Sequence, residues 1–506
     1  MENKTIKRAL ISVYHKDGID IIAKKLHALG VEILSTGGTY DYIKEIGVPV
    51  TTVEDITSYP SILGGRVKTL HPKVFGGILA RRENSKDLNQ LNEYEIPAID
   101  LVIVDLYPFQ EYVSSNSPHN EIIEKIDIGG ISLIRAAAKN YKDVVIVACK
   151  EQYNNLINIL ERGSSTTLKE RLYFAAEAFN VSSHYDTSIF KYFEKENPIE
   201  SFKESVTESH PLRYGENPHQ KARFFGAQNK MPKQIHGKEI SYNNLLDIEA
   251  AIELIWDFEQ PTVAILKHNN ACGCASCDTI AQAWDNALAA DPISAFGGVI
   301  ASNREIDAQT AQEINKLFFE VIIAPSYSSE ALGILKQKKN RIILLCNTDL
   351  RSDKKFRSLL GGVLVQDRDS ISETAQELTP VTNKKATQSQ IKDMIFANKL
   401  VKHSKSNAIV LVKDSMLLAS GVGQTSRVDA LNQAITKAKN FGLELDGAVM
   451  ASDAFFPFPD CVEIAHKAGI TAVIQPGGSI KDGESIEYCN NNGVAMVTTG
   501  RRHFKH

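Results

Sequence analysis

Residues 9–39, ALISVYHKDGIDIIAKKLHALGVEILSTGGT, carry the pattern that decides the fold class of the N-terminal region. Two apolar runs in it, Ala9 to Val13 and Val31 to Leu34, predict buried β-strands. Between them, apolar residues recur at the spacing of one helical face, so a helix is expected there, with Asp17 as its N-cap and Gly30 at its end. The stretch therefore predicts a strand–helix–strand unit.

Two later apolar runs extend this unit into a parallel sheet. Leu101 to Val104 and Val144 to Val147 are apolar at every position, as strands buried on both faces are. The alternation of strands and helices predicts a doubly wound α/β domain over residues 1–150. The pattern then becomes helical, so residues 151–200 are predicted to form a helical connector that ends in the polar run Glu194 to Pro198.

A second α/β region is expected over residues 201–506. Its strands are predicted from further apolar runs at 262–266, 321–324, 342–345, 409–412, 448–451 and 472–474. A charged stretch near residues 367–385 is expected to divide the region into two lobes. No internal sequence repeat is visible between them.

Composition and charge restrict the class of protein. The chain has 506 residues with 61 acidic and 57 basic side chains, and this balance argues against a protein that coats nucleic acid. No apolar run is long enough to span a bilayer, and residues 1–4 lack the apolar core of a signal peptide. The odd number of cysteines, seven, indicates reduced thiols rather than a disulfide framework. We therefore expect a cytoplasmic enzyme that does not bind a membrane.

The first candidate site is expected after the strands of the N-terminal domain. The run Thr36-Gly37-Gly38-Thr39 lies between a predicted strand and a predicted helix, where glycines free backbone N–H groups to face a phosphate. An ordinary strand-to-helix loop has the same composition. The signal is stronger in Gly64 to Pro72, GGRVKTLHP, because Arg66 and Lys68 alternate and would point the same way from an extended segment. Cations beside glycines predict a phosphorylated ligand, with a solvated basic loop as the alternative.

Two other segments are expected to join this site. Asp105-Leu106-Tyr107 follows a predicted strand, at the sheet edge where α/β proteins bind ligands. Asp127-Ile128-Gly129-Gly130 precedes a predicted helix that carries Arg135 and Lys139. Lys139 follows three alanines, so partial desolvation is expected to lower its pKa towards the range useful for acid–base catalysis. A surface lysine on an alanine-rich helix is the alternative.

The run Arg213-Tyr214-Gly215-Glu216-Asn217-Pro218-His219-Gln220 is the richest polar motif of the chain. Its glycine and proline predict a loop rather than a helix or strand. Arginine suits a phosphate or a carboxylate, and tyrosine and histidine suit a heterocycle. We therefore expect this loop to hold a polar ligand, with a plain surface turn as the alternative.

A second catalytic site is expected at Lys267-His268-Asn269-Asn270, directly after the predicted strand 262–266. A strand end is the usual position of catalytic groups in an α/β fold. His268 can exchange a proton near neutral pH, and Lys267 can stabilise a developing negative charge. A lone histidine would more often be structural, but this pair favours catalysis.

Three neighbouring cysteines raise the question of zinc. Cys274 and Cys277 have the C-x-x-C spacing that zinc deaminases combine with an H-x-E motif. No H-x-E motif shortly precedes them, and no second pair of ligands lies at a suitable distance. We therefore expect no metal here. The small residues near Cys272 are expected instead to let the backbone approach a ligand.

Further candidates for ligand contact lie downstream. Ser406-Asn407 and Gly421 to Arg427 are predicted to flank a hairpin. Phe455 to Asp460, FFPFPD, places aromatic rings beside a carboxylate, which suits a planar ring with N–H groups, although core packing explains the aromatics equally well. The basic C-terminal run Arg501 to His506 contains a phenylalanine, so it is expected to be pinned and to offer Arg502 to a phosphate.

Taken in order, these motifs closely resemble the bifunctional AICAR transformylase/IMP cyclohydrolase family of purine biosynthesis. The resemblance covers nearly the whole chain, and the ordered set of motifs is far more specific than any one of them. The segments that carry it are 36–39, 64–72, 127–130, 135–140, 213–220, 267–268 and 452–458.

The resemblance implies a fold and two reactions. It implies an N-terminal methylglyoxal-synthase-like domain for the cyclohydrolase and a C-terminal transformylase region of two cytidine-deaminase-like lobes without the zinc. The transformylase moves a formyl group from 10-formyltetrahydrofolate, a co-substrate, to the 5-amino group of AICAR. The cyclohydrolase closes formyl-AICAR to IMP with loss of water. A homodimer with transformylase sites across the subunit interface is implied, without a catalytic metal or a nucleic acid.

The resemblance also assigns roles to residues. In formyl transfer, His268 assists proton removal and Lys267 stabilises the developing charge. In ring closure, Lys139 moves protons and Asp127 orients the carboxamide. Lys68 and Tyr107 support the oxyanion and the leaving hydroxyl.

Binding residues are assigned in the same way. The matches to nucleotide contacts of the cyclohydrolase are Lys16, Thr36, Gly37, Gly38, Thr39, Arg66, Lys68, Thr69, Asp105, Asp127 and Ile128. The matches to AICAR contacts of the transformylase are Arg213, Tyr214, His268, Gly297, Glu320, Asn407, Phe455 and Arg502. The matches to folate contacts are Arg427, Asp460, Ile474 and Gln475.

A few positions depart from the family pattern. Ala271 stands where many bacterial members carry proline, Glu320 where some carry aspartate, and Tyr14-His15 where Ser-Asp is common. Three other classes of protein stay open from the sequence: a methylglyoxal-synthase-like signalling module, a zinc nucleoside deaminase and a non-catalytic nucleotide-binding protein. The first would explain only the first ~200 residues.

Overall fold

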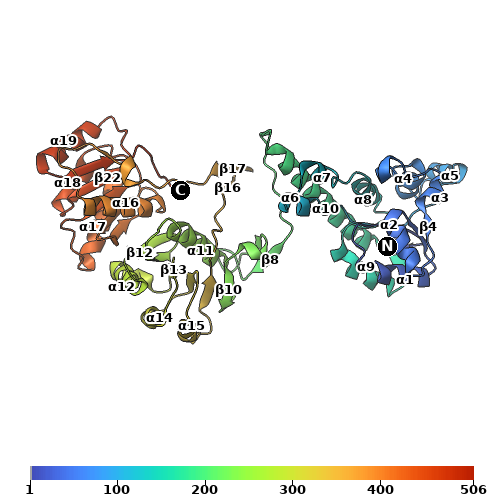
Figure 1. Cartoon of the computed structure of the whole chain (residues 1–506), viewed down its shortest axis with the longest axis horizontal. Helices are drawn as coiled ribbons and strands as arrows, with labels where there is room; N and C mark the ends of the chain where they lie inside the picture. The colour runs from blue at the N-terminus through green and yellow to red at the C-terminus, as the bar shows by residue number, and fades with distance from the viewer. Residues whose placement is uncertain (1–2) are drawn as a thin grey trace. The chain divides into compact units, whose positions relative to one another are not determined.

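The computed structural model describes residues 3–506 and divides into two compact units, one up to Thr207 and the other from Glu208 onward (Figure 1). Each unit has its own sheets and its own hydrophobic cores. No helix among residues 3–506 is both long and apolar enough to cross a membrane.

The first unit is built on a five-stranded parallel sheet in the order β4-β3-β2-β5-β6. The strands are β2 (Arg8–Ser12), β3 (Glu32–Ser35), β4 (Thr51–Thr52), β5 (Leu101–Val104) and β6 (Val145–Val147). The chain winds outwards from β2 through β3 to β4 and then returns to start β5 on the other side of β2. The predicted doubly wound α/β fold is thereby confirmed. In such sheets ligands bind at the carboxyl ends of the strands, where the order reverses.

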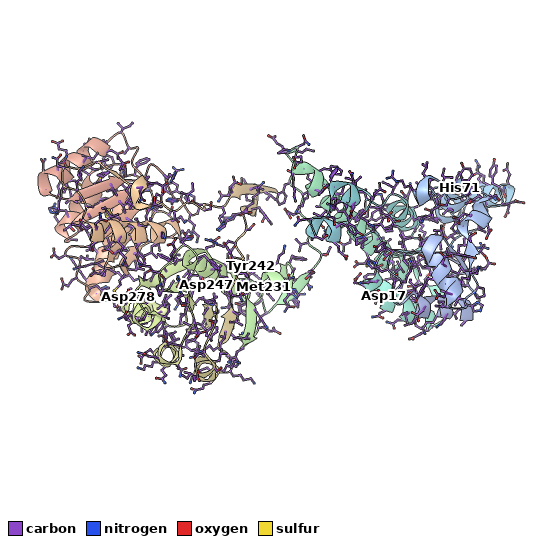
Figure 2. All side chains as sticks on the ribbon, in the orientation of Figure 1. Asp17, His71, Met231, Tyr242, Asp247 and Asp278 are labelled. Carbon is purple, nitrogen blue, oxygen red and sulfur yellow. The ribbon has the colours of Figure 1, made fainter. Side chains whose placement is uncertain are left out.

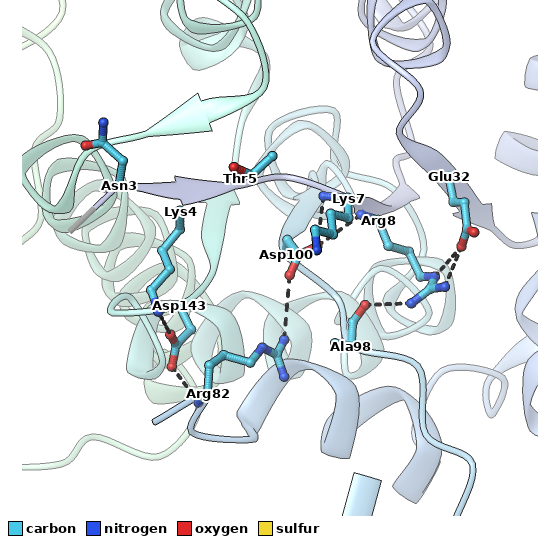
Figure 3. A pocket seen from close by; sticks show the side chains of 10 residues that line it. All are labelled: Asn3, Lys4, Thr5, Lys7, Arg8, Glu32, Arg82, Ala98, Asp100 and Asp143. Atoms are coloured by element: carbon cyan, nitrogen blue, oxygen red, sulfur yellow. Dashed lines mark hydrogen bonds and ion pairs between the residues drawn. The ribbon is translucent and has the colours of Figure 1, made fainter. Parts of the chain in front are cut away.

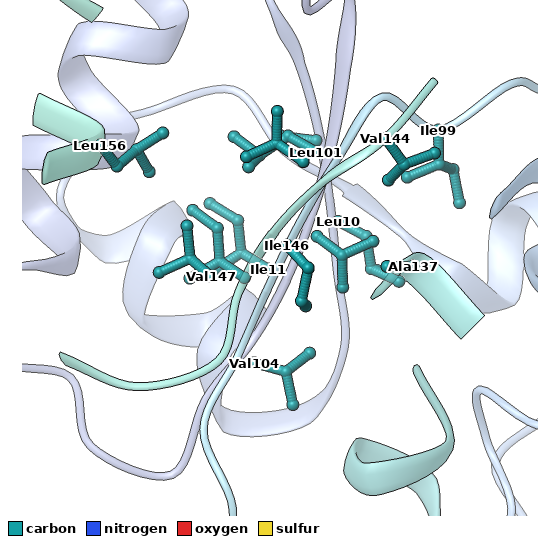
Figure 4. Close-up of a cluster of buried hydrophobic side chains, with 14 of the residues drawn as sticks. Leu10, Ile11, Ile99, Leu101, Val104, Ala137, Val144, Ile146, Val147 and Leu156 are labelled. Carbon is teal, nitrogen blue, oxygen red and sulfur yellow. The ribbon is translucent and has the colours of Figure 1, made fainter. Parts of the chain in front are cut away.

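Helices cover both faces of this sheet. They include α1 (Ile19–Ala28), α2 (Gly37–Glu45), α4 (Pro72–Leu79), α8 (Gly129–Lys139), α9 (Tyr153–Leu160) and α10 (Leu168–Glu194). Figure 4 shows side chains of β2, β5 and β6 packed in one cluster with Ala137 of α8 and Leu156 of α9. Every residue of β5 is buried, which explains why its sequence is continuously apolar.

The start of α1 differs from the prediction. Its N-cap is Gly18, which has a φ of 81°, and no side chain caps the helix, so the assignment of Asp17 as the cap is wrong. The left-handed turn at Gly18 lets the carbonyl of Lys16 accept from the Ile19 N–H at 3.1 Å instead. The predicted end is confirmed, because Gly30, with a φ of 72°, follows the last turn.

The second unit is built on a twelve-stranded mixed sheet in the order β10-β15-β14-β13-β11-β12-β20-β19-β21-β22-β23-β18. The strands of one half are β10 (Lys233–His236), β11 (Thr262–Lys267), β12 (Asn270–Ser276), β13 (Val299–Ser302), β14 (Val321–Ala324) and β15 (Ile342–Leu345). Those of the other half are β18 (Thr379–Pro380), β19 (Ile409–Lys413), β20 (Met416–Gly421), β21 (Val449–Ser452), β22 (Ala472–Gln475) and β23 (Ala495–Thr498). The halves join where Ala275 of β12 pairs with Met416 of β20.

The two halves repeat one topology that the sequence does not reveal. In each, a helix leads into an antiparallel hairpin, and three strands, parallel to one another, follow outwards from the first strand of the hairpin. The helices are α11 (Tyr242–Ile255) before β11 and α16 (Gln388–Lys402) before β19. Different apolar residues fill equivalent positions, so the repeat lies in the fold and not in the residue identities.

The hydrophobic cores are arranged differently on the two faces of this sheet. On one face, α11 and α16 share a single cluster that runs across both halves. On the other face, α12 (Ile280–Ala290) and α17 (Arg427–Asn440) belong to two separate clusters. A hairpin of β16 (Lys354–Leu359) and β17 (Gly362–Asp367) lies in the segment that connects the halves.

The six strands predicted in the second region are all present, with ends that differ by one residue at most. β12 was not predicted, because its sequence, NACGCAS, consists of small residues with a weak apolar signal. Its glycine has a packing reason: a Cβ on Gly273 would lie 2.0 Å from the carbonyl oxygen of Ala287 in α12. Small residues here let a helix approach the strand.

Candidate active sites

The first candidate site lies at the carboxyl edge of the parallel sheet, where the order reverses between β2 and β5. Asp105 directly follows β5, and its carboxylate accepts from the backbone N–H groups of Tyr14 and His15, the second at 3.0 Å. The same carboxylate lies 2.8 Å from Nδ1 of His15. Asp105 thus ties together the two strand ends at which the fold favours a ligand.

Two lysines lie beside the start of α2. Lys16 Nζ donates to Thr39 Oγ1 at 3.0 Å and to the carbonyl of Val13. Burial lowers the pKa of Lys16, the charge of Lys68 acts in the same direction, and Asp105 opposes both. A Cβ on Gly37 would lie 3.3 Å from Lys68 Nζ, so the Lys68 ammonium rests against the backbone at the helix start. Ammonium groups and free N–H groups together suit a phosphate.

Asp127 belongs to the same cluster, close enough for the charge of Asp105 to act on it. Its Oδ1 accepts from the Gly130 N–H at 2.6 Å, and a Cβ on Gly130 would lie 2.8 Å from the carboxylate oxygens, so a larger residue there would displace the carboxylate. Burial raises the pKa of Asp127, and the charge of Asp105 adds to it against the backbone hydrogen bonds. Burial also raises the pKa of Tyr107, with the Asp127 charge acting in the same sense. Thr69 joins the group, since a Cβ on Gly129 would lie 3.2 Å from its Oγ1.

Lys125 is a charged neighbour of this cluster that the sequence analysis missed. Its Nζ lies 4.6 Å from the ring centre of Tyr112, 5.7 Å from that of Tyr14 and 5.8 Å from that of Tyr107. No motif includes Lys125, so its position two residues before Asp127 is the one signal in the sequence that could have identified it.

Two predictions about this site are wrong in their geometry. Arg66 and Lys68 do not share an extended segment, because residues Leu63–Gly65 form a 3-10 turn; Arg66 has helical angles and pairs with Glu124. Lys139 is exposed, so the expected desolvation is absent. It ends α8, about 15 Å along the helix from Gly129, and the buried face of that turn is formed by Ala136, Ala137 and Ala138 instead.

A cavity of about 540 Å³ lies at the opposite edge of the same sheet, at the amino ends of the strands (Figure 3). Its charged side chains neutralise one another: Arg8 pairs with Glu32, and Lys4 lies 3.0 Å from Asp143. None of the predicted site residues lines it. A smaller cavity of about 220 Å³ adjoins the candidate site, where Lys68 lines it with Tyr59 and His71.

The second candidate site is built on the tight turn between β11 and β12. His268 and Asn269 occupy its centre with φ values of 51° and 64°, as a type I′ hairpin turn requires. His268 is exposed at the tip of this turn, and the Nζ of Lys267 donates to the carbonyl of Phe296 at 2.6 Å. The pair predicted to be catalytic is therefore held at a strand end with the imidazole open to solvent.

Asp247 supports this turn and was not predicted. It lies on α11 (Figure 2), and its Oδ1 accepts from the Asn269 N–H at 2.7 Å. Burial raises the pKa of Asp247, the charge of Glu320 adds to this, and His268 opposes it. No sequence signal marks Asp247, because it lies 22 residues from its partner in an ordinary helix.

Glu320 and Gly297 lie on neighbouring segments of the same half. Glu320 Oε2 accepts from Lys238 Nζ and from Asn244 Nδ2, each at 3.2 Å. Gly297 has a φ of 72°, which favours glycine, and its N–H donates to the carbonyl of Phe318 at 2.7 Å.

The other half of the sheet contributes a second group of predicted residues. Asn407 Nδ2 donates to the carbonyl of Gln424 at 3.0 Å. Asp453 accepts from Ser406 Oγ at 2.5 Å and from Arg427 at 3.2 Å. The two halves meet here, since the Lys405 N–H donates to Asn270 Oδ1 at 3.0 Å, next to the turn that carries His268.

The C-terminal segment is pinned against this group, as predicted. The ring of Phe504 lies 4.2 Å from the guanidinium carbon of Arg502 and 5.7 Å from that of Arg427. The His503 N–H donates to the carbonyl of Asp453 at 3.2 Å. Arg502 itself is exposed, so its guanidinium is accessible to an anion.

Several predicted ligand residues are not joined to these groups by any contact that the structure shows for residues 3–506. The motif 213–220 is confirmed as a loop, between β8 (Ser209–Leu212) and β9 (Ala222–Phe225). Phe455 and Asp460, which follow Asp453 closely in the sequence, are exposed. Ile474 and Gln475 are completely buried in β22, so their side chains offer no surface to a folate.

The cysteines lie in the sheet rather than in a ligand set. Cys274 packs in the core on one face and Cys272 in the core on the other, because the pairing of β11 with β12 shifts register between them. Cys277 accepts from Asn286 Nδ2 at 3.4 Å. Across residues 3–506 no group of three or more His, Cys, Asp or Glu side chains is placed to hold a metal ion.

Comparison with known proteins identifies the family. The sequence profile described as "AICARFT/IMPCHase bienzyme" matches residues 137–437, and the profile described as "MGS-like domain" matches residues 18–132. A protein of Bacteroides thetaiotaomicron named "Bifunctional purine biosynthesis protein PurH" is 63% identical over 100% of both chains. The chain belongs to the AICARFT/IMPCHase bienzyme family.

Other members of the AICARFT/IMPCHase family match over the same length. Proteins with the same name from Acetivibrio thermocellus and from a Thermoanaerobacter species are 49% and 48% identical, over 99% of this chain and 100% of theirs. The MGS-like match contains the Asp105 and Asp127 cluster, and the bienzyme match contains His268 and Asn407. These two pairs of polar residues therefore fall in two different family regions.

Proposed function

We infer that this protein is a bifunctional enzyme of purine biosynthesis, a phosphoribosylaminoimidazolecarboxamide formyltransferase and IMP cyclohydrolase. It transfers a formyl group from 10-formyltetrahydrofolate to the 5-amino group of AICAR and then closes formyl-AICAR to IMP with loss of water. The observation that carries this conclusion is the 63% identity over the full length of a PurH protein. The two polar clusters, one in each unit, supply one site for each reaction.

The division of labour along the chain is part of the proposal. Residues 1–150 form the methylglyoxal-synthase-like cyclohydrolase domain, residues 151–200 the helical connector and residues 201–506 the transformylase. The match of an MGS-like profile to residues 18–132 supports the first assignment. The repeated topology of the twelve-stranded sheet supports two lobes of cytidine-deaminase-like type that divide near residues 367–385.

Formyl transfer is assigned to the turn between β11 and β12. The 5-amino nitrogen of AICAR bonds to the formyl carbon and loses a proton, while N10 of the folate leaves with the bonding electrons and takes up a proton. His268 receives the proton from the amine, and Lys267 stabilises the negative charge on the formyl oxygen. The amine is a weak nucleophile, since its lone pair is delocalised into the imidazole and the carboxamide.

The binding residues of this site are assigned by the resemblance and by position. AICAR contacts are assigned to Arg213, Tyr214, Gly297, Glu320, Asn407, Phe455 and Arg502, and folate contacts to Arg427, Asp460, Ile474 and Gln475. The link between Asn270 and Lys405 supports a site that draws on both halves of the sheet. For Ile474 and Gln475 the resemblance is the only support, because both are buried.

Ring closure is assigned to the cluster at the carboxyl edge of the parallel sheet. The carboxamide nitrogen attacks the formyl carbon and loses one proton, which moves to the formyl oxygen. The former 5-amino nitrogen loses a second proton as it forms a double bond to the same carbon, and the oxygen leaves with both protons as water. Asp127 orients the carboxamide, and Lys68 and Tyr107 support the oxyanion and the leaving hydroxyl. The phosphate is held by Lys16, the run 36–39, Arg66 and Thr69, with Asp105 and Ile128 completing the nucleotide contacts. Positioning of the two reacting atoms supplies much of the rate enhancement.

Lys139 is the catalytic assignment with the least structural support. The resemblance gives it the proton transfer of ring closure. Lys139 is exposed and lies at the far end of α8 from Asp127, so it does not contact the cluster.

A second copy of the chain is the proposed partner. The hairpin β16–β17 presents apolar side chains to solvent, with Leu360 fully exposed and Leu364 61% exposed. An apolar hairpin of this kind suits a homodimer interface. A cytoplasmic location and the absence of nucleic-acid binding belong to the same proposal, on the grounds of composition.

A spectroscopic assay of the full chain with AICAR and 10-formyltetrahydrofolate tests the function. Formation of tetrahydrofolate and of IMP is expected, at the same rate with and without a chelator. Binding of AICAR without turnover would support a non-catalytic protein, and loss of activity with chelator would support a metal enzyme.

A further inference from the structure

One buried imidazole fixes the C-terminal segment. His503 is 4% exposed, its Nδ1 lies 2.6 Å from Asp369 Oδ2, and its Nε2 lies 3.1 Å from Glu373 Oε1. A neutral imidazole has one N–H donor and can satisfy only one of two carboxylates, whereas an imidazolium donates from both nitrogens. The geometry therefore requires the charged ring.

The groups around His503 are consistent with that charge. Glu373 is buried and also accepts from Asn398 Nδ2 at 2.7 Å, so it has no access to bulk water in place of the imidazole. The charge of Lys402, on α16, helps to lower the pKa of Asp369. The charge of Arg501, in the C-terminal segment, does the same for Glu373. Burial lowers the pKa of His503, but the hydrogen bonds and charges of Asp369 and Glu373 outweigh it and raise that pKa to about 9.

The residues on either side of His503 belong to the candidate transformylase site. Arg502 precedes it, and Phe504 follows it, with its ring centre 4.2 Å from the guanidinium carbon of Arg502 and 5.7 Å from that of Arg427. One residue further, the carbonyl of Lys505 accepts from the Ser406 N–H at 2.9 Å, immediately before Asn407. The anchor and the proposed ligand-binding residues are therefore adjacent in the same short segment.

We propose that His503 is a positioning residue for formyl transfer: its charged ring, clamped between Asp369 and Glu373, fixes the C-terminal segment so that Arg502 and Phe504 are held at the AICAR site. This inference rests on the proposed function and adds a residue to it. His503 touches neither substrate; it acts through Arg502, which offers its guanidinium to the phosphate of the nucleotide.

The clamp acts on binding rather than on the chemical step. When the ring is neutral, one of the two carboxylates loses its donor, and when the ring is absent both lose it, so the segment that carries Arg502 is less firmly held at the site. Only the fraction of molecules with the segment in place binds the nucleotide well, so the apparent affinity is the intrinsic affinity multiplied by that fraction. The reaction at the His268 turn proceeds normally once the nucleotide is bound.

The substitution His503→Gln in the full-length protein tests the clamp. The KM for AICAR is expected to rise about tenfold, because a charge-assisted bond is lost, while kcat changes by less than about threefold. Cyclisation of supplied formyl-AICAR should stay unchanged and shows that the first unit is folded. His466→Gln is the matched control, since His466 is half-buried in the same unit and its Nδ1 lies 3.2 Å from the Tyr488 hydroxyl, a neutral partner.

Two further measurements separate positioning from a general loss of structure. The KM for AICAR of the unsubstituted protein should rise between pH 8 and 10, and this rise should be absent in His503→Gln. Hydrogen exchange of residues 498–506 should become faster in His503→Gln. It should become faster to a smaller extent in Asp369→Asn, a substitution that keeps the volume of the side chain. An unchanged KM in both variants, or the same pH dependence with and without His503, would overturn the proposal.

The outcome is separable from that of the proposed function. If the unsubstituted protein forms no tetrahydrofolate from AICAR and 10-formyltetrahydrofolate, the function is wrong. If it does, and His503→Gln has the same KM and the same hydrogen exchange, only the clamp is wrong.

Discussion

The two units build their candidate sites on different features of a sheet. In the first unit the polar residues follow the ends of parallel strands, on either side of the reversal between β2 and β5. In the second unit the pair proposed to be catalytic lies at a tight turn with two positive φ values, supported by a helix, and the tail from the end of the chain contacts the neighbouring group around Asp453. The first arrangement follows from the topology of the sheet, whereas the second depends on contacts between segments far apart in sequence.

This difference has a consequence for robustness. Strand ends in a buried parallel sheet are fixed by many backbone hydrogen bonds, so a single side chain contributes little to their position. The turn at His268 holds non-glycine residues in the left-handed region, which costs energy that its supporting contacts must offset. Substitutions remote from the chemistry should therefore harm formyl transfer more readily than cyclisation.

The largest expected effect separates the two reactions. His268→Ala should lower the rate of formyl transfer by about 10³-fold, because the general base is lost, and should leave the cyclisation of supplied formyl-AICAR unchanged. His466→Ala serves as the control in the same unit. A folded His268→Ala protein that lacked both activities would remove the distinction between the sites.

The reverse separation is expected from the first unit. Lys139→Ala should abolish cyclisation, and Lys68→Ala should lower it by about 10²-fold through loss of charge stabilisation, with formyl transfer intact in both. Lys142→Ala, at an exposed lysine just beyond α8, is the matched control. If Lys139→Ala cyclised normally while Lys68→Ala did not, Lys139 would take no part in cyclisation, in agreement with its exposed position.

A smaller effect is expected from the residue that supports the turn carrying His268. Asp247→Ala removes the acceptor of the Asn269 N–H and should lower kcat for formyl transfer by about tenfold or more, because the turn loses its position. Asp247→Asn keeps an oxygen in place and should retain most of the activity. Equal losses in the two variants would show that the carboxylate charge, and not the hydrogen bond, is what matters.

The smallest effect is a dependence of stability on pH in the second unit. His503 has a pKa of about 9 when folded, above its value of about 6.5 in the unfolded chain. Its contribution is therefore complete below about pH 6.5 and is lost as the pH rises through 9, by about 1–3 kcal/mol in total. Urea unfolding of the unsubstituted protein and of His503→Gln should differ at pH 6.5 and converge at pH 10. A constant difference would show that the ring is not charged in the folded state.

Local sequence was enough to predict the position of much of the first candidate site. The apolar runs located its strands, and the residues directly after them, such as Asp105, were found because strand ends converge at one sheet edge. The errors concern side-chain direction. Asp17 does not cap α1, and Lys139 is exposed, because neither a cap nor burial follows from residue type alone.

Less of the second site was accessible to sequence reasoning. His268 was found because it follows a predicted strand, but Asp247 has no local signature and acts through a backbone N–H. The repeated topology and the clamp on His503 arise from pairings between distant segments, Asp369 lying 134 residues before its partner. Such contacts are set by tertiary packing, which a single sequence does not display.

The central claim is that one chain carries two independent sites that act in succession on the same nucleotide. Mixing the purified His268→Ala and Lys68→Ala proteins with AICAR and 10-formyltetrahydrofolate tests it most directly. Each variant alone should form little IMP, and the mixture should form IMP at many times the summed rate, because one protein makes formyl-AICAR and the other closes its ring. A mixture no faster than the sum of its parts, with both proteins folded, would contradict the account.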